Sequence, residues 1–158
     1  VYKRQVNRCE RIAVAGSGKV GGYVHAGGKL GVVVGLATEA SGEALDVLAK
    51  DLSMHVAAAD PSPVSVDRDG VPQELIEREK ELFRRQAEQE GKPDKVIDKI
   101  VEGRIKKYYG EVCLLEQRFV KDPDKTLKQL LEEVGGQLAS PVGVSSFVRF
   151  KLGESASE

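Results

Sequence analysis

The chain has 158 residues, of which 41% are hydrophobic and 31% are charged. This composition is typical of a folded, soluble domain rather than a disordered segment. The 24 Lys and Arg residues nearly balance the 25 Asp and Glu residues, so the net charge of −1 gives no general basic surface for nucleic acid. No run approaches the ~20 apolar residues of a membrane span. The two cysteines form no disulfide framework, and we expect a cytoplasmic protein.

The N-terminal part of the chain has the alternation of a small sheet. Three strands are predicted, at residues 12–15, 20–25 and 30–36. The third is almost entirely apolar, and we expect a central strand that is buried on both faces. Gly27 and Gly28 precede it. They favour a tight hairpin turn, because glycine reaches positive φ without steric cost.

A helix is predicted over residues 42–59. Ser41 is placed to cap its first turn, and Pro61 and Pro63 end it. Residues 63–69 are expected to form a link or a short edge strand. The apolar residues of the helix recur at spacings of three and four and predict one buried stripe: Leu45, Leu48, Leu52 and Val56.

Residues 73–90 and 94–109 are predicted to form two helices joined by the turn Gly91-Lys92-Pro93. Because the turn is short, the helices should be antiparallel neighbours. Their apolar stripes are narrow and their other faces are strongly charged, which favours a protruding hairpin over a buried helix pair. The expected stripe residues are Leu75, Leu82 and Phe83, then Val96, Ile100, Val101 and Ile105.

A further helix is predicted over residues 123–134, with Asp122 as its cap, Pro123 at its first position and Gly135 after its end. Residues 144–152 alternate as a final strand that completes the sheet. This order predicts an α+β fold, with a small antiparallel sheet covered by helices on one face and the protruding antiparallel helical hairpin. The expected inward residues of the helix are Leu127, Leu130, Leu131 and Val134.

Residues 16–21 fit the dinucleotide-binding pattern G-x-G-x-x-G, and Glu39 lies about twenty residues further on. The pattern binds a pyrophosphate only at a helix N-terminus. Here the following residues alternate as a strand and include many glycines, each of which opposes a helix by roughly 1 kcal/mol. A turn between strands is therefore favoured and no cofactor is expected. A helix around Gly21 would instead indicate a dinucleotide-dependent enzyme.

Other residues with chemical potential are sparse. The histidines His25 and His55 and the cysteines Cys9 and Cys113 lack the spacing of a metal site, and no metal is expected. Spacing alone leaves a catalytic cysteine–histidine pair open, although no other residue supports one. The residues by themselves therefore predict a binding or assembly domain and not an enzyme.

Five segments, in the correct order, resemble elongation factor Ts, a bacterial translation factor. Together they cover roughly residues 8–154. The segments are residues 23–32 (YVHAGGKLGV), 48–59 (LAKDLSMHVAAA), 91–93 with 99–104 (GKP and KIVEGR), 113–120 (CLLEQRFV) and 147–150 (FVRF).

The resemblance implies a guanine nucleotide exchange factor that binds elongation factor Tu in its GDP form and promotes GDP release. A partner that prefers nucleotide-free Tu must weaken nucleotide binding by the same coupling energy. Two family features have no counterpart here: the N-terminal Tu-binding helical domain and the Thr-Asp-Phe-Val motif that acts as a wedge near the nucleotide of Tu. We therefore expect a fragment that carries the distal Tu-binding half and exchanges nucleotide poorly alone.

The resemblance also implies partner-binding residues. The positions that match the Tu-facing half of the family are His25, Gly27, Gly28, Lys29, Met54 and His55. The helical hairpin is associated with dimer contacts in some members, so a homodimer through the hairpin is a second expectation. No nucleic acid or membrane partner is expected. The alternative hypothesis is a self-associating α+β module without exchange activity.

The expected domain organisation is a core subdomain with an insertion. Residues 6–71 and 110–154 should form the core, and residues 72–109 the inserted helical hairpin, or coiled coil. Because the chain begins at Val1 without a methionine, we expect a truncated piece in which residues 1–5 are not native. Residues 155–158 should form a tail.

Overall fold

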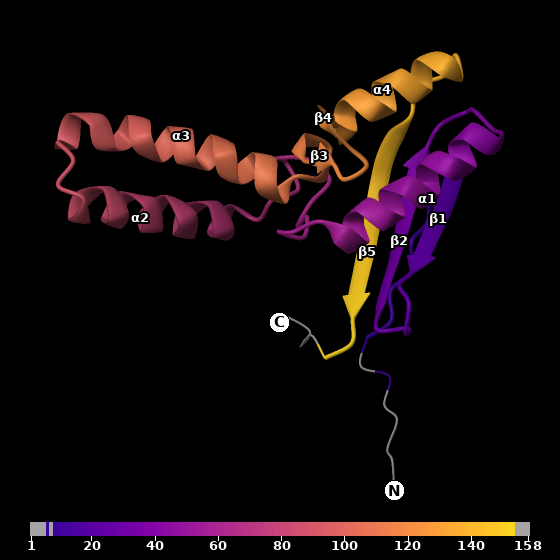
Figure 1. Cartoon of the computed structure of the whole chain (residues 1–158), viewed down its shortest axis with the longest axis horizontal. Coiled ribbons are helices and arrows are strands. Elements are labelled where there is room, and N and C mark those ends of the chain that lie inside the picture. Colours follow the sequence, from indigo (N-terminus) through magenta and orange to yellow (C-terminus); the bar gives the residue numbers. More distant parts are fainter. Residues whose placement is uncertain (1–5, 7, 154–158) are drawn as a thin grey trace, which may run out of the picture. The chain divides into compact units, whose positions relative to one another are not determined.

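The structure, a computed structural model, describes residue 6 and residues 8–153 (Figure 1). The chain forms two compact units, one from the residues up to Ala58 and from Gln129 onward, and the other from Ala59–Lys128. Helices combined with small antiparallel sheets confirm the predicted α+β class. The expected division into a core and an inserted, protruding hairpin stays a prediction. None of the described helices has the length and apolarity to cross a membrane.

The first unit contains a three-stranded antiparallel sheet in the order β1 (Gly18–Val24), β2 (Leu30–Ala37) and β5 (Gly143–Lys151). The central position of β2 is as predicted. Helix α1 (Glu43–Ala58) packs against β1 and β2 and covers one face of the sheet. Three β2 side chains that point to that face are at most 2% exposed: Val32, Val34 and Leu36.

The opposite face of the sheet is more open. Val33 on β2 is 38% exposed, so the prediction that this strand is buried on both faces is wrong. The predicted first strand is also wrong, because residues 12–15 adopt no strand. Ile12 and Val14 instead lie over Gly35, where an added Cβ would be 3.2 and 3.1 Å from their side chains. An apolar segment can thus bury side chains on a glycine without forming a ladder of hydrogen bonds.

The hairpin turn between β1 and β2 is confirmed. Gly27 and Gly28 have φ of 88° and 69°, the left-handed region that glycine adopts most readily. The His25 amide donates to the Leu30 carbonyl at 2.8 Å, and the Gly28 amide donates to the His25 carbonyl at 3.0 Å. The turn therefore depends on backbone geometry at both glycines.

Helix α1 has the predicted bounds to within a residue. Its stripe is confirmed, since Leu45, Leu48, Leu52 and Val56 are all at most 3% exposed. The residue at its N-terminal boundary is Gly42 rather than Ser41. The Gly42 carbonyl accepts hydrogen bonds from the amides of Leu45 and Asp46 at 3.1 and 3.3 Å.

The helix predicted at residues 123–134 is displaced. Asp122–Thr126 form strand β4, which pairs with β3 (Arg118–Phe119), and α4 spans Leu127–Gln137. Asp122 and Pro123 therefore belong to a strand rather than a helix start, and Gly135 lies inside the helix. The Leu127 amide at the start of α4 donates to the Gln117 carbonyl at 3.0 Å, and the Arg118 guanidinium donates to the Asp124 carbonyl at 3.1 Å.

The second unit contains the two predicted helices, α2 (Gln73–Gln89) and α3 (Asp94–Val112), which pack against each other. The predicted stripe is partly wrong: Leu82 and Val96 are 46% and 40% exposed. Two facing helices bury only the residues along their line of contact, so a side chain that lies one position away from that line is exposed. The residues of these helices that are buried in their shared core are Ile76, Ala87, Ile97, Val101, Ile105 and Val112.

Hydrogen bonds join the segment that leads into α2 to the segment that leaves α3, and we call this region the neck (residues 61–66 and 111–117). The Val64 amide donates to Val112, and the Leu114 amide to Ser65, at 2.8 and 2.9 Å. Ser65 and Cys113 form an isolated parallel bridge, where a link or edge strand was predicted. The Gln117 side-chain amide donates to the carbonyls of Pro61 and Glu111 at 3.0 and 2.6 Å. A short 3₁₀ helix, Leu114–Glu116, lies within the neck.

Candidate functional site

The β1–β2 turn gathers four of the expected partner-binding residues on one exposed surface, which we call the turn surface. His25, Gly27, Gly28 and Lys29 are all exposed. The Tyr23 hydroxyl and His25 Nδ1 are 3.1 Å apart, which orients the imidazole beside the turn. The two glycines add no side chain, so their backbone is open to close approach by another protein.

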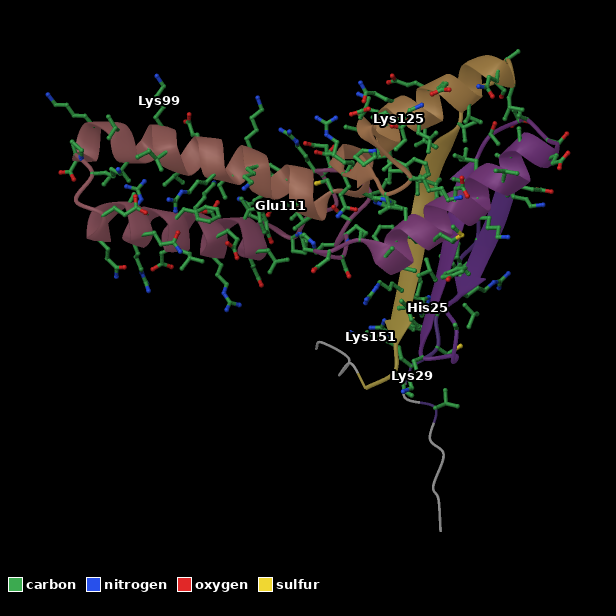
Figure 2. The ribbon with its side chains drawn as sticks, in the orientation of Figure 1. His25, Lys29, Lys99, Glu111, Lys125 and Lys151 are labelled. Carbon is green, nitrogen blue, oxygen red and sulfur yellow. The ribbon has the colours of Figure 1, made fainter. Side chains whose placement is uncertain are left out.

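A third basic residue extends the turn surface. Lys151 on β5 pairs with Leu30 on β2, and the Leu152 amide donates to the Lys29 carbonyl at 2.7 Å. Figure 2 shows His25, Lys29 and Lys151 at the same end of the sheet. Sequence reasoning missed Lys151, although the pairing of a final strand with β2 would have indicated it. The exposed Lys29 suits an acidic protein surface.

Met54 and His55 lie on α1 and differ in accessibility. Met54 is half-buried, whereas His55 is 1% exposed and belongs to the core of the first unit. His55 is three residues from Leu52 and so falls on the buried side of the helix. It does not contribute to the exposed turn surface.

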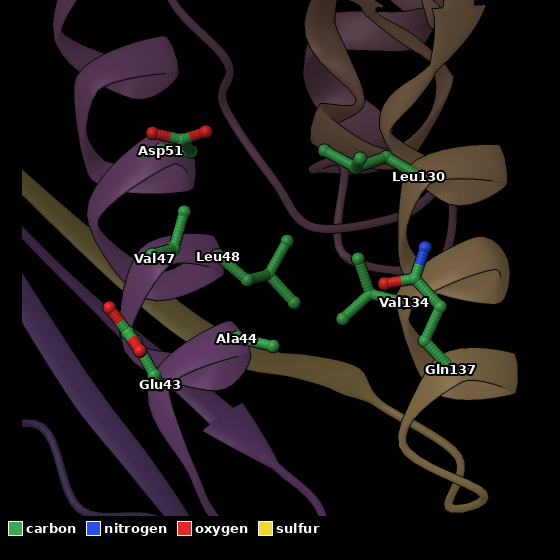
Figure 3. A pocket seen from close by; sticks show the side chains of 8 residues that line it. All are labelled: Glu43, Ala44, Val47, Leu48, Asp51, Leu130, Val134 and Gln137. Carbon is green, nitrogen blue, oxygen red and sulfur yellow. The ribbon is translucent and has the colours of Figure 1, made fainter.

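A groove between α1 and α4 forms an open recess of about 420 Å³. Its lining is mostly apolar (Figure 3). The sequence did not indicate this groove, because its two helices are distant in the sequence and their placement side by side is a tertiary feature.

The glycines of the G-x-G-x-x-G pattern do not precede a helix. Gly18 and Gly21 lie in strand β1, so these residues form no helix N-terminus for a pyrophosphate. Gly21 has a packing role instead: an added Cβ would be 2.6 Å from the Cβ of Ala49 on α1. The absence of a side chain at Gly21 lets the helix approach the sheet.

Two titratable groups of the second unit, Cys113 and Glu116, have pKa values that their surroundings in the fold shift. Burial raises the pKa of the Cys113 thiol, which opposes the thiolate that a nucleophile requires. The Arg68 guanidinium donates to Glu116 at 2.8 Å and holds the pKa of that carboxyl below its usual value. Within residue 6 and residues 8–153, no group of three or more His, Cys, Asp or Glu residues is placed to hold a metal ion.

These features define a candidate surface for binding another protein. A family model described as "Elongation factor TS" matches residues 3–154. Elongation factor Ts of Geobacter sulfurreducens is 49% identical over 144 residues, which are 89% of this chain and 66% of that protein. Elongation factor Ts of Clostridium perfringens strain SM101 is 50% identical over 149 residues, 94% of this chain and 48% of that protein. The chain belongs to the elongation factor Ts family, and it spans about half to two thirds of the length of these relatives.

Proposed function

We propose that this chain is the part of a bacterial elongation factor Ts that binds elongation factor Tu during translation in the cytoplasm. The observation that carries the proposal is the family match, which extends over residues 3–154. The whole factor would bind Tu·GDP and promote GDP release. It would act by binding rather than by covalent chemistry, because a preference for nucleotide-free Tu is enough to weaken nucleotide binding.

The turn surface is the proposed contact with Tu. Its support is the exposure of His25, Gly27, Gly28 and Lys29, together with the open backbone of the glycines. Met54 joins the proposal as a half-buried side chain that adapts to an apolar partner. His55 would act indirectly, by holding α1 in place, because it is 1% exposed.

Two measurements on one sample test this proposal: complex formation with Tu·GDP by calorimetry, and the release rate of a fluorescent GDP analogue. We expect binding to Tu with slow release of GDP, because the chain lacks the wedge motif. A partner that binds both nucleotide states of Tu equally well does not shift the equilibrium between them. Absence of binding would refute the proposed function. Release as fast as with a full-length factor would refute the role given to the wedge.

Charge reversal tests the contact itself. Lys29→Glu should weaken Tu binding by about five- to tenfold, since it places like charge against an acidic partner surface. Lys99→Glu is the matched control, because Lys99 is an exposed lysine on α3 in the other unit. Equal losses from both variants would show that the turn surface is not the contact.

Self-association without exchange activity is the second candidate function. One observation favours it: the open face of the sheet carries the exposed apolar residues Val20 and Val24, which are 46% and 70% exposed. The helical hairpin, with Leu82 and Val96 exposed, is the other proposed dimer contact. Sedimentation equilibrium of Val24→Glu and Leu82→Glu would separate the two surfaces, and a monomeric unmodified chain would refute both.

A further inference from the structure

His25 lies at the start of the β1–β2 turn, and its main chain and its ring are held by different groups. The His25 amide donates to the Leu30 carbonyl at 2.8 Å, and the His25 carbonyl accepts from the Gly28 amide at 3.0 Å. These two bonds fix the backbone of His25 but leave the torsions of its side chain undetermined. The ring is held by Tyr23, whose hydroxyl oxygen lies 3.1 Å from His25 Nδ1. The centroids of the two rings are 6.1 Å apart.

Tyr23 is a firm support for this ring, because strand β1 places it on the packed face of the sheet. Its partner in the strand register is Val32 on β2, which is 2% exposed and points to the face that α1 covers. Tyr23 is half-buried, whereas His25 is exposed. Tyrosine has an apolar body and a polar tip, so its ring can pack in the fold while its hydroxyl reaches a group at the surface. A fixed tyrosine thus carries an exposed imidazole.

The polarity of the hydrogen bond between Tyr23 and His25 decides which nitrogen of His25 carries the proton. A neutral imidazole has one N–H donor and one acceptor nitrogen, and the bond made by one nitrogen sets the state of the other. The phenol hydroxyl is an effective donor, because its oxygen shares a lone pair with the ring, and an unprotonated imidazole nitrogen is an effective acceptor. A bond from Tyr23 to Nδ1 therefore leaves the proton of His25 on Nε2. Since His25 is exposed, Nε2 remains accessible to a partner.

We propose that Tyr23 is a positioning residue of the turn surface: it holds His25 as the Nε2–H tautomer, so that the surface presents an N–H donor to an acceptor oxygen of the partner. This inference rests on the proposed binding of Tu at the turn surface. Lys29, at the same end of the sheet, has the same polarity, because an ammonium group only donates. Gly27 and Gly28 lie between the two donors and have no side chain that would keep a partner at a distance. The group recognised is therefore a carbonyl or carboxylate oxygen.

Two-bond ¹H–¹⁵N correlation NMR on the isotope-labelled full chain measures the tautomer directly, at alkaline pH so that imidazoles are neutral. The chain has two histidines, so the buried His55 provides the one other imidazole and serves as an internal reference. We expect the Nε2–H pattern for His25 in the unmodified chain. Tyr23→Phe keeps the ring and removes the hydroxyl. In this variant the His25 signals should shift toward the average of two exchanging tautomers, while the His55 signals stay unchanged.

Calorimetry with Tu·GDP measures the consequence for binding. Tyr23→Phe should weaken the affinity about three- to tenfold, the range expected for the loss of one hydrogen bond. Tyr108→Phe is the matched control and should leave the affinity unchanged, since Tyr108 is a half-buried tyrosine of the other unit. Glutamine places its amide nitrogen near the position of Nε2 and asparagine near that of Nδ1, so His25→Gln should bind more tightly than His25→Asn. Tyr23→Phe should have little further effect in His25→Gln, because an amide has no tautomer to set.

Both measurements have results that would overturn the proposal. Tyr23 does not set the tautomer if His25 carries its proton on Nδ1 in the unmodified chain, or if Tyr23→Phe leaves the His25 signals unchanged. Equal losses of affinity in Tyr23→Phe and Tyr108→Phe, or additive losses in the double variant Tyr23→Phe with His25→Gln, would show that the hydroxyl does not act through His25. Failure of the unmodified chain to bind Tu would refute the proposed function, while the NMR result would still decide whether Tyr23 positions His25.

Discussion

The contact between Gly21 on β1 and Ala49 on α1 predicts that Gly21→Ala destabilises the first unit, even though alanine suits a strand no less than glycine does. An added Cβ would be 2.6 Å from the Ala49 Cβ and 3.1 Å from the Ala49 carbonyl. Carbon atoms in favourable contact are roughly 3.5–4.0 Å apart, so the helix would have to move outward by about 1 Å. The neighbouring atoms include helix backbone, which cannot turn aside as a flexible side chain does.

The expected change in the free energy of unfolding of Gly21→Ala combines two opposed contributions. Overpacking of this kind costs about 1–3 kcal/mol. Replacing glycine by alanine recovers about 0.4–1 kcal/mol, because the unfolded chain loses conformational freedom. We expect a net loss of about 1–2 kcal/mol, and a fall in Tm of about 2–4 °C per kcal/mol for a chain of this size.

Urea titration followed by far-ultraviolet circular dichroism is the assay, because the chain has no tryptophan. Gly22→Ala is the control: its added Cβ would meet Val32 O at 3.4 Å, an ordinary contact, so stability should be unchanged or slightly higher. Ala49→Gly should lose about 1 kcal/mol alone through helix propensity. The double variant Gly21→Ala with Ala49→Gly should lose less stability than the two single variants lose in sum, and the difference should be about 0.5 kcal/mol or more. Equal stability of Gly21→Ala and Gly22→Ala, or strict additivity in the double variant, would refute the close-contact argument.

Two further predictions concern the turn and the Arg68–Glu116 pair. Gly27→Val and Gly28→Val should each lower the free energy of unfolding by about 1 kcal/mol or more, because φ is 88° and 69° there, and an unchanged Tm for both would contradict the turn's dependence on glycine. In the folded state the pKa of Glu116 is lowered below its ordinary 4.5, chiefly by the hydrogen bond from Arg68. The contribution of Glu116 to the free energy of unfolding is therefore present above pH 4.5 and is lost as pH falls through the folded pKa. Glu116→Gln should therefore lose up to about 1 kcal/mol at neutral pH, a small effect because the pair is partly exposed, and should flatten the decline of stability below pH 4.5. Exposed Glu132→Gln is its control, and identical pH profiles for the two variants would show that the pair contributes nothing.

The elements that were predicted correctly have strong periodic patterns that their tertiary contacts reinforce. The stripe on α1 and the apolar run of β2 face each other, so local preference and packing agree at Leu52 and Val34. The segment at residues 12–15 has the same alternation as a strand, yet its side chains pack on Gly35 without strand pairing. An alternating apolar pattern indicates which side chains are buried, but it does not indicate which groups form backbone hydrogen bonds.

The error at α4 has a different cause. Asp122 followed by Pro123 is a strong helix-start signal, but pairing with a two-residue strand at Arg118–Phe119 overrides it. The groove between α1 and α4 depends on how these two helices, distant in the sequence, lie beside each other, and local patterns do not indicate that. For the proposed contact with Tu, the resemblance indicated the glycines of the turn. The sequence left open whether Met54 and His55 face the sheet, because the burial of His55 depends on the register of α1 against the sheet.

The hydrogen-bonded neck of the second unit has a consequence for chain length. Since Val64 and Ser65 are bonded to Val112 and Leu114, the two ends of the α2–α3 segment are held together whatever lies between them. The entropy lost on joining two chain ends rises only with the logarithm of the separation, about 0.6 kcal/mol for each doubling of a flexible loop. Gain or loss of whole helical turns at the far end of α2 and α3 would therefore change the length of these two helices at little cost in chain-closure entropy, so their length can vary independently of the neck.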